Sequence, residues 1–171
     1  MNVTLRGLAA AGVALVLLAA GAARAQAPGT FDLITEAEAQ QAAKAEREAP
    51  PEVRTRQIVV PKTNVPAIRV ISPTTPGAAV AAVAAAPLRI ELAFTPTPGT
   101  RIVPSSFRVL YGLLKIDLTD RLRQHATVTE AGVVVDRAVV PVGQHRLILQ
   151  VADDKGNTAE QELRIRVGAA S

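Results

Sequence analysis

Apolar and polar residues alternate along most of the chain after residue 66. This period of two occurs in segments 68–70, 88–94, 107–111, 114–118, 147–151 and 163–167, and more weakly in 125–129 and 133–140. Such alternation is typical of β-strands with one buried face and one solvated face. About seven short strands separated by turn residues predict an all-β fold, an antiparallel β-sandwich over residues 64–168 with a short tail at 169–171.

Two stretches inside this region break the alternation. Residues 72–87 are rich in Ala, Pro and Gly, and we expect a long loop there between the first two strands. Residues 117–124 are compatible with a single helical turn, which Asp117 or Thr119 would cap. No long amphipathic helix competes with the sandwich prediction.

Residues 26–63 have a different composition. Thr35 and Glu38 have the spacing of a capping box, and an Ala-, Glu- and Gln-rich stretch continues to Glu48, which predicts a helix over 35–48. Ala is almost the only apolar residue of this stretch, so it offers no hydrophobic face, and a solitary helix of this length is marginal in water. We therefore interpret residues 26–63 as a flexible tether containing that helix.

The first 25 residues resemble an export signal. Arg6 precedes an uncharged run of 17 residues from Gly7 to Ala23, and Ala23-Arg24-Ala25 matches a small-x-small cleavage site. An uncleaved anchor is the alternative, but a membrane-spanning helix needs about 20 apolar residues. Cleavage predicts a periplasmic or secreted protein that is not stably inserted in the membrane.

Composition excludes several classes of function. The chain has no Cys, no Trp and two His, which excludes disulfides, thiolate metal sites and a histidine-rich metal centre. Loss of Arg6 and Arg24 would leave 17 basic and 15 acidic side chains, without a basic stripe. Nucleic-acid binding is therefore not expected, and neither is a cofactor.

The strand sequences resemble bacterial immunoglobulin-like domains over about residues 64–168. The resemblance rests on Pro66-Ala67-Ile68-Arg69-Val70, on residues 88–94 and 104–109, on Gly143-Gln144-His145-Arg146-Leu147, and on the turn Asp153-Asp154-Lys155-Gly156-Asn157. Residues 107–121 are also similar to uncharacterised exported proteobacterial proteins of this kind. The resemblance implies an Ig-like sandwich of about seven strands and does not specify an activity.

His145 stands where such domains often carry a corner tyrosine. By alternation it shares the inward face with Leu147, so we expect its ring to hydrogen-bond the backbone at the entry to its strand. A metal-binding or catalytic role is the alternative, for which the sequence offers no second ligand or base.

The acidic pairs Asp117/Asp120 and Asp153/Asp154 are the candidates for a calcium site. Calcium takes about six or more oxygen ligands, and neither run has the spacing of a dedicated calcium loop. Structural roles in a helix cap and a hairpin turn are the favoured interpretation.

No arrangement of residues predicts catalysis, because the serines lack a nucleophile-elbow motif and the two His do not define a triad. Apolar Leu110, Leu113 and Ile148 are expected to point outward, and we predict a protein-contact face comprising Arg108, Leu110, Leu113, Lys115, Asp117 and Arg121. The sequence thus favours an exported, monomeric, non-catalytic module that binds a protein of the bacterial envelope. A cell-wall or polysaccharide binding module is the alternative, and an enzyme or a metal-delivery protein is a further one.

Signal cleavage is directly testable. Because the apolar run is short and ends at Ala23-Arg24-Ala25, the exported protein should begin at Gln26. Intact-mass spectrometry of protein recovered from the native host checks this, and a mass that includes Met1 would contradict cleavage.

Overall fold

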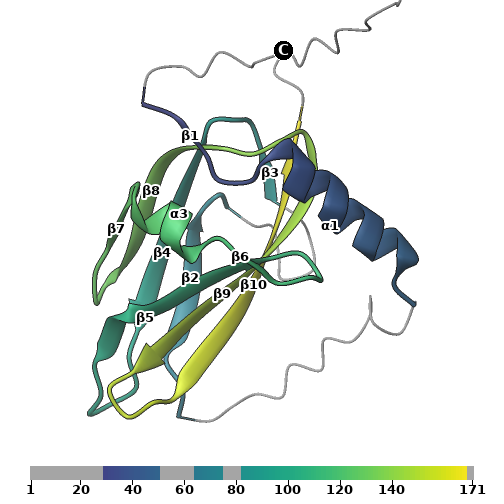
Figure 1. Cartoon of the computed structure of the whole chain (residues 1–171). Helices are drawn as coiled ribbons and strands as arrows, with labels where there is room; N and C mark the ends of the chain where they lie inside the picture. The colour runs from purple at the N-terminus through teal and green to yellow at the C-terminus, as the bar shows by residue number, and fades with distance from the viewer. Residues whose placement is uncertain (1–28, 51–63, 75–81, 169–171) are drawn as a thin grey trace, which may run out of the picture.

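Two five-stranded sheets pack as a β-sandwich with little helix in the computed structural model, which describes residues 29–50, 64–74 and 82–168 (Figure 1). One sheet comprises β1 (Phe31–Asp32), β2 (Ala67–Ser72), β4 (Leu88–Thr95), β7 (Ala126–Val128) and β8 (Gly132–Val139). Its order is β1-β8-β4-β2, and β7 pairs with β8. The other comprises β3 (Ala82–Ala84), β5 (Ile102–Tyr111), β6 (Ile116–Asp117), β9 (Gly143–Asp153) and β10 (Thr158–Val167), in the order β3-β10-β9-β5-β6.

The alternating positions form the core, as the sequence predicts. Every expected inward residue of β4, β9 and β10, and of β5 from Phe107 onward, is at most 6% exposed: Leu88, Ile90, Leu92, Phe94, Phe107, Val109, Tyr111, Leu147, Leu149, Val151, Leu163, Ile165 and Val167. Ile68 and Val70 of the edge strand β2 are half-buried. Burial of these aliphatic and aromatic side chains is the main favourable term for the sandwich.

The sheets are mixed rather than purely antiparallel. β1 pairs in parallel with β8, and β3 pairs in parallel with β10. β3 lies within the stretch expected to be a loop, of which residues 75–81 lie outside the described residues. Three small apolar residues carry too little pattern to predict a strand, and only the neighbouring edge of β10 stabilises one there.

The interpretation of the N-terminal segment as a flexible tether is wrong for residues 31–48. The predicted helix is present as α1 (Glu36–Glu48), with Thr35 as its N-cap and the capping box formed. Before it, Phe31, Leu33 and Ile34 are 6%, 0% and 1% exposed and belong to the main core. The helix lacks an apolar face, but the residues that precede it provide the anchor.

Two further expectations need correction. The segment 114–118 is not a continuous strand, because residues 112–115 form a turn in which Gly112 and Lys115 have positive φ, and only β6 follows. Leu114 is consequently 49% exposed.

Ile148 points away from the core as expected, yet it is only 4% exposed, because it lies opposite Leu110 and Glu162 on the neighbouring strands. The helical turn expected at 117–124 is present as α3 (Thr119–Arg123).

A pair of substitutions tests the assignment of the two strand faces. Leu149, 2% exposed in the middle of β9, should lose about 2–5 kcal/mol of unfolding free energy on substitution by Ala, through lost burial and the resulting cavity. Arg108, with a 63% exposed side chain on β5, should change it by about 0.5 kcal/mol or less as Arg108→Ala. Urea unfolding followed by circular dichroism measures both, and equal losses would contradict the assignment.

Candidate functional site

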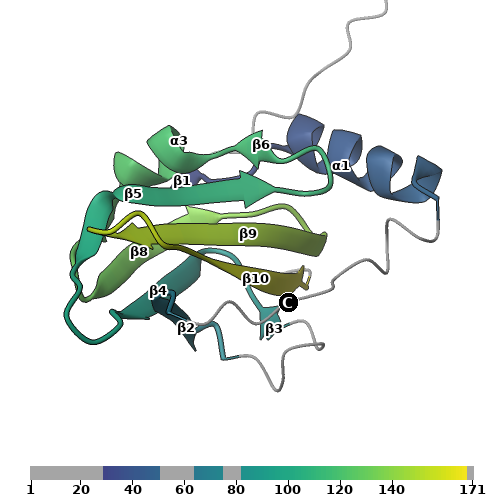
Figure 2. The ribbon, with the colours of Figure 1, turned by 90° about the horizontal axis from the view of Figure 1, so that it is seen from below.

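A groove of about 640 Å³ opens where α1 meets one end of the β5–β9–β10 sheet. It lies at the end of the sandwich that holds the start of β9 and the end of β10, opposite to the β9–β10 turn. Figure 2 shows α1 and the β5–β6 hairpin extending side by side at this end. The described lining residues come from four separate parts of the chain: Ala42, Ala43, Glu46, Arg47, Tyr111, Gly112, Leu113, Gln144, His145, Arg146, Arg164 and Ile165.

Small residues allow α1 to lie close to the β5–β6 turn. Gly112, with a φ of 65°, lies beneath Ala42, and a Cβ at Gly112 would be 3.1 Å from that of Ala42. Ala42 is the only buried residue of the helix, and Ala39 is partly buried. Because these side chains are short, the helix covers the end of the sheet without filling the space beside it.

A bidentate ion pair fastens α1 to the sandwich. Arg121 of α3 donates to both carboxylate oxygens of Glu38, at 2.8 and 2.9 Å, and also to the carbonyl oxygen of Leu33 at 2.9 Å. Glu38 also accepts hydrogen bonds from the backbone N–H and hydroxyl of Thr35. Arg121 is the main cause that lowers the pKa of Glu38 to about 2.

The floor of the groove contains a buried polar pair. Nε2 of His145 lies 2.8 Å from the carbonyl oxygen of Pro141, and Nδ1 lies 2.9 Å from the Tyr111 hydroxyl. Since a carbonyl oxygen only accepts, Nε2 carries the proton and, in the neutral ring, Tyr111 donates to Nδ1. The expected backbone hydrogen bond of His145 at the entry to β9 is therefore confirmed.

Burial controls the ionisation of both groups. It lowers the pKa of His145 below its usual value and raises the pKa of Tyr111 to about 12. The neutral imidazole and the neutral phenol are thus the stable forms at neutral pH. Each ring nitrogen of the imidazole already has a partner, which is the arrangement of a structural corner.

The wall opposite α1 is cationic. Arg146 and Arg164 lie directly opposite each other on β9 and β10, and both bind the same carboxylate, that of Glu162. Arg146 contacts it at 2.8 Å, and its side chain is 21% exposed, against 11% for Glu162. On the helix side, Arg47 and Glu46 complete the charged lining.

The predicted contact face is divided by the structure. Arg108, Leu110 and Asp117 lie together on β5 and β6, where Arg108 and Asp117 form an ion pair of 3.6 Å and Leu110 is half-buried. Lys115 is exposed in the turn between β5 and β6, and Leu113 of that turn lines the groove. Arg121 is engaged with Glu38, so its guanidinium serves the attachment of α1.

Three of the four acidic candidates have structural partners, and one of these is Asp154, whose Oδ1 accepts from the backbone N–H of Arg101 at 3.1 Å. Oδ1 of Asp117 accepts from the backbone N–H of Thr119 at 2.8 Å, but the N-cap of α3 is Leu118 and it has no side-chain cap hydrogen bond, so the expected cap by Asp117 or Thr119 is wrong. Asp153 accepts from the backbone N–H groups of Lys155 and Asn157 and from the Asn157 amide. These hydrogen bonds, first those from Thr119 and Asn157, lower the pKa of both carboxyls. Among the described residues, no group of three or more acidic or His side chains has the arrangement of a metal site.

Sequence reasoning missed the α1 side of the groove and the paired arginines. A signal for α1 was present in Phe31, Leu33 and Ile34, three large apolar residues directly before the capping box. No local signal identified Arg146 and Arg164 as neighbours, because their pairing depends on the β9–β10 register.

Comparison with known proteins places few constraints on function. No protein-family model and no curated protein matches this sequence. The crystal structure of CopC from Methylosinus trichosporium OB3b matches 59% of this chain and 93% of its own, with a TM-score of 0.39 and 15% identity. Likeness at this level does not bear on function. In the part of the chain that the structure describes, no helix is long and apolar enough to cross a membrane.

The ion pair that fastens α1 gives a pH-dependent prediction. Glu38→Gln should lower the unfolding free energy at pH 7 by about 1–2 kcal/mol, because solvent partly screens Arg121. The folded-state pKa of Glu38 lies near 2, below its usual 4.5, so this contribution is present above pH 4.5 and is lost as the pH falls towards 2. Urea unfolding at pH 7 and pH 3 should therefore show a smaller difference between wild type and variant at pH 3.

Glu48→Gln is the matched control. Glu48 is also on α1, but its pair with Lys44 is 3.8 Å long and both side chains are about two-thirds exposed. This variant should change stability by less than about 0.5 kcal/mol at either pH. An equal effect of the two variants would show that Glu38 has no special part in attaching the helix.

Proposed function

We propose that this chain is an exported, non-catalytic β-sandwich module that binds a protein partner in the bacterial cell envelope, at the end that carries the groove. Export and localisation rest on the N-terminal signal segment, which lies outside the described residues. The Ig-like relationship inferred from the strand sequences agrees with a binding role, since such sandwiches present varied surfaces on one scaffold.

One observation carries the proposal. The β5–β6 turn exposes Leu114 to 49%, directly beside Leu113 in the sequence, which lines the groove. An apolar turn next to a concave surface with charged walls has the composition of a protein interface, in which an apolar centre is surrounded by polar groups. Arg108 and Lys115 of the predicted contact face lie on the same hairpin.

A non-catalytic role agrees with the state of the groove floor. Both ring nitrogens of His145 are hydrogen-bonded, one to a carbonyl oxygen and the other to Tyr111. The imidazole therefore has no unoccupied nitrogen with which to accept a proton from a substrate.

A protein partner is favoured over a polysaccharide by the position of the aromatic rings. The four aromatic residues Phe31, Phe94, Phe107 and Tyr111 are each no more than 6% exposed. Sugar-binding surfaces commonly use exposed aromatic faces, and these rings are committed to the core.

Site-specific photocrosslinking in envelopes of the native host tests the proposal. A photoreactive phenylalanine analogue at Leu114 should give a discrete protein adduct. The same analogue at Lys155, in the turn at the opposite end of the sandwich, is the control and should give none. No adduct at Leu114, or equal adducts at the two positions, would contradict binding at the groove end.

A further inference from the structure

The charges that line the groove are unbalanced. Arg47, Arg146 and Arg164 contribute three guanidinium groups, whereas two carboxylates lie near them: Glu46 among the described lining residues, and Glu162, which pairs with Arg146 and Arg164. We propose that the groove recognises an acidic peptide segment of the partner, with a carboxylate side chain bound between Arg146 and Arg164. This inference rests on the proposed function, since it names the chemistry of the partner at the same site.

The cross-strand arginine pair carries the inference. Arg146 and Arg164 are directly opposite in the antiparallel register, a position where like charges destabilise a sheet. Glu162 lies between them and binds both, but one carboxylate neutralises only one of two positive charges. Each guanidinium has five N–H donors, so the pair retains both charge and donors for a second carboxylate.

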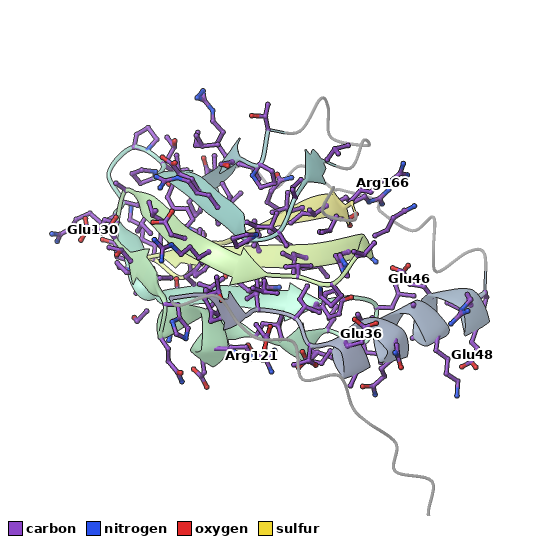
Figure 3. All side chains as sticks on the ribbon, turned by 90° about the horizontal axis from the view of Figure 1, so that it is seen from above. Glu36, Glu46, Glu48, Arg121, Glu130 and Arg166 are labelled. Atoms are coloured by element: carbon purple, nitrogen blue, oxygen red, sulfur yellow. The ribbon has the colours of Figure 1, made fainter. Side chains whose placement is uncertain are left out.

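The opposite wall limits where an anion fits. In Figure 3, Glu46 stands on the side of α1 that faces Arg166 at the end of β10, and Glu48 lies at the far end of the helix. An incoming carboxylate would therefore bind nearer the sheet than the helix. Arg47, one residue further along α1, adds a positive charge on the helix side.

Apolar and amide groups favour a peptide over a small anion. Ala42, Ala43, Leu113 and Ile165 provide apolar lining, and the exposed Gln144 offers an amide that both donates and accepts. From Ala42 to the end of α1, the helix rises about 9 Å, the length of about three extended residues. The groove thus suits an acidic residue flanked by small apolar residues.

A titration of the mature protein with defined peptides tests this recognition. The probe is acetyl-Ala-Glu-Ala-Glu-Ala-amide, and acetyl-Ala-Gln-Ala-Gln-Ala-amide is the uncharged match. Backbone amide NMR shifts should saturate at residues 42–47, 112–113, 144–146 and 164–165, and the uncharged peptide should bind about tenfold more weakly. Equal affinities, shifts confined to other regions, or no shifts at millimolar peptide would overturn the proposal.

Two variants and one control assign the binding to the groove. Arg164→Gln, whose side chain is 41% exposed, keeps the Arg146–Glu162 pair and should weaken binding of the acidic peptide about tenfold. Ala43→Phe places bulk in the groove at an exposed helix position and should weaken binding without changing any charge. Arg101→Gln removes the same type of charge from an exposed position beside Asp154, at the opposite end of the sandwich, and should leave affinity within about twofold, because solvent screens distant exposed charges.

The outcomes separate this inference from the proposed function. A discrete crosslink at Leu114 together with no preference for the acidic peptide would overturn acidic recognition and leave protein binding standing. Absence of both would overturn the two proposals together. Binding of polygalacturonate with the same affinity and the same shifted amides would overturn a peptide as the occupant and favour an acidic polysaccharide.

Discussion

The position of α1 depends on one carboxylate that serves two structures at once. Glu38 closes the capping box with Thr35 and forms the bidentate pair with Arg121 on α3. The first contact starts the helix and the second attaches it to α3, so one side chain contributes both to the formation of the helix and to its position. Arg121 also binds the Leu33 carbonyl oxygen, which links the buried segment before the helix to the same point.

The core is made almost entirely of aliphatic side chains, and this has consequences for the helix. Phe31, Leu33 and Ile34 enter the core through β1, whereas α1 itself contributes only short alanine side chains. Strong attachment at one end and thin packing along its length leave space between helix and sheet. The groove is therefore a product of composition: larger residues on the inner face of α1 would have filled it.

The charged side chains around the groove are paired differently from those on the rest of the sheet surface. Elsewhere on the described sheet surface each paired arginine has at least one carboxylate of its own, as in Arg108 with Asp117 and Arg89 with both Glu91 and Asp136. At the groove, two arginines share Glu162 across the β9–β10 ladder. A cross-strand like-charge pair costs free energy in the free protein, and a ligand carboxylate would relieve that cost on binding. This contrast makes the arginine pair the most informative polar feature of the surface.

The sequence by itself determined which residues of the main strands face inward, because side chains alternate strictly along a strand. The backbone hydrogen bond of His145, which is present, was expected from this alternation together with the resemblance to Ig-like domains. The helix α1 and its N-cap were likewise predicted from local sequence. Only the tertiary structure decided that residues 31–34 join the core, that residues 82–84 form a strand and that Ile148 is covered. The tertiary structure alone also decided the pairing of Arg146 with Arg164 and the presence of the groove. Each depends on which distant segments become neighbours, and periodicity within one element carries no information about those contacts.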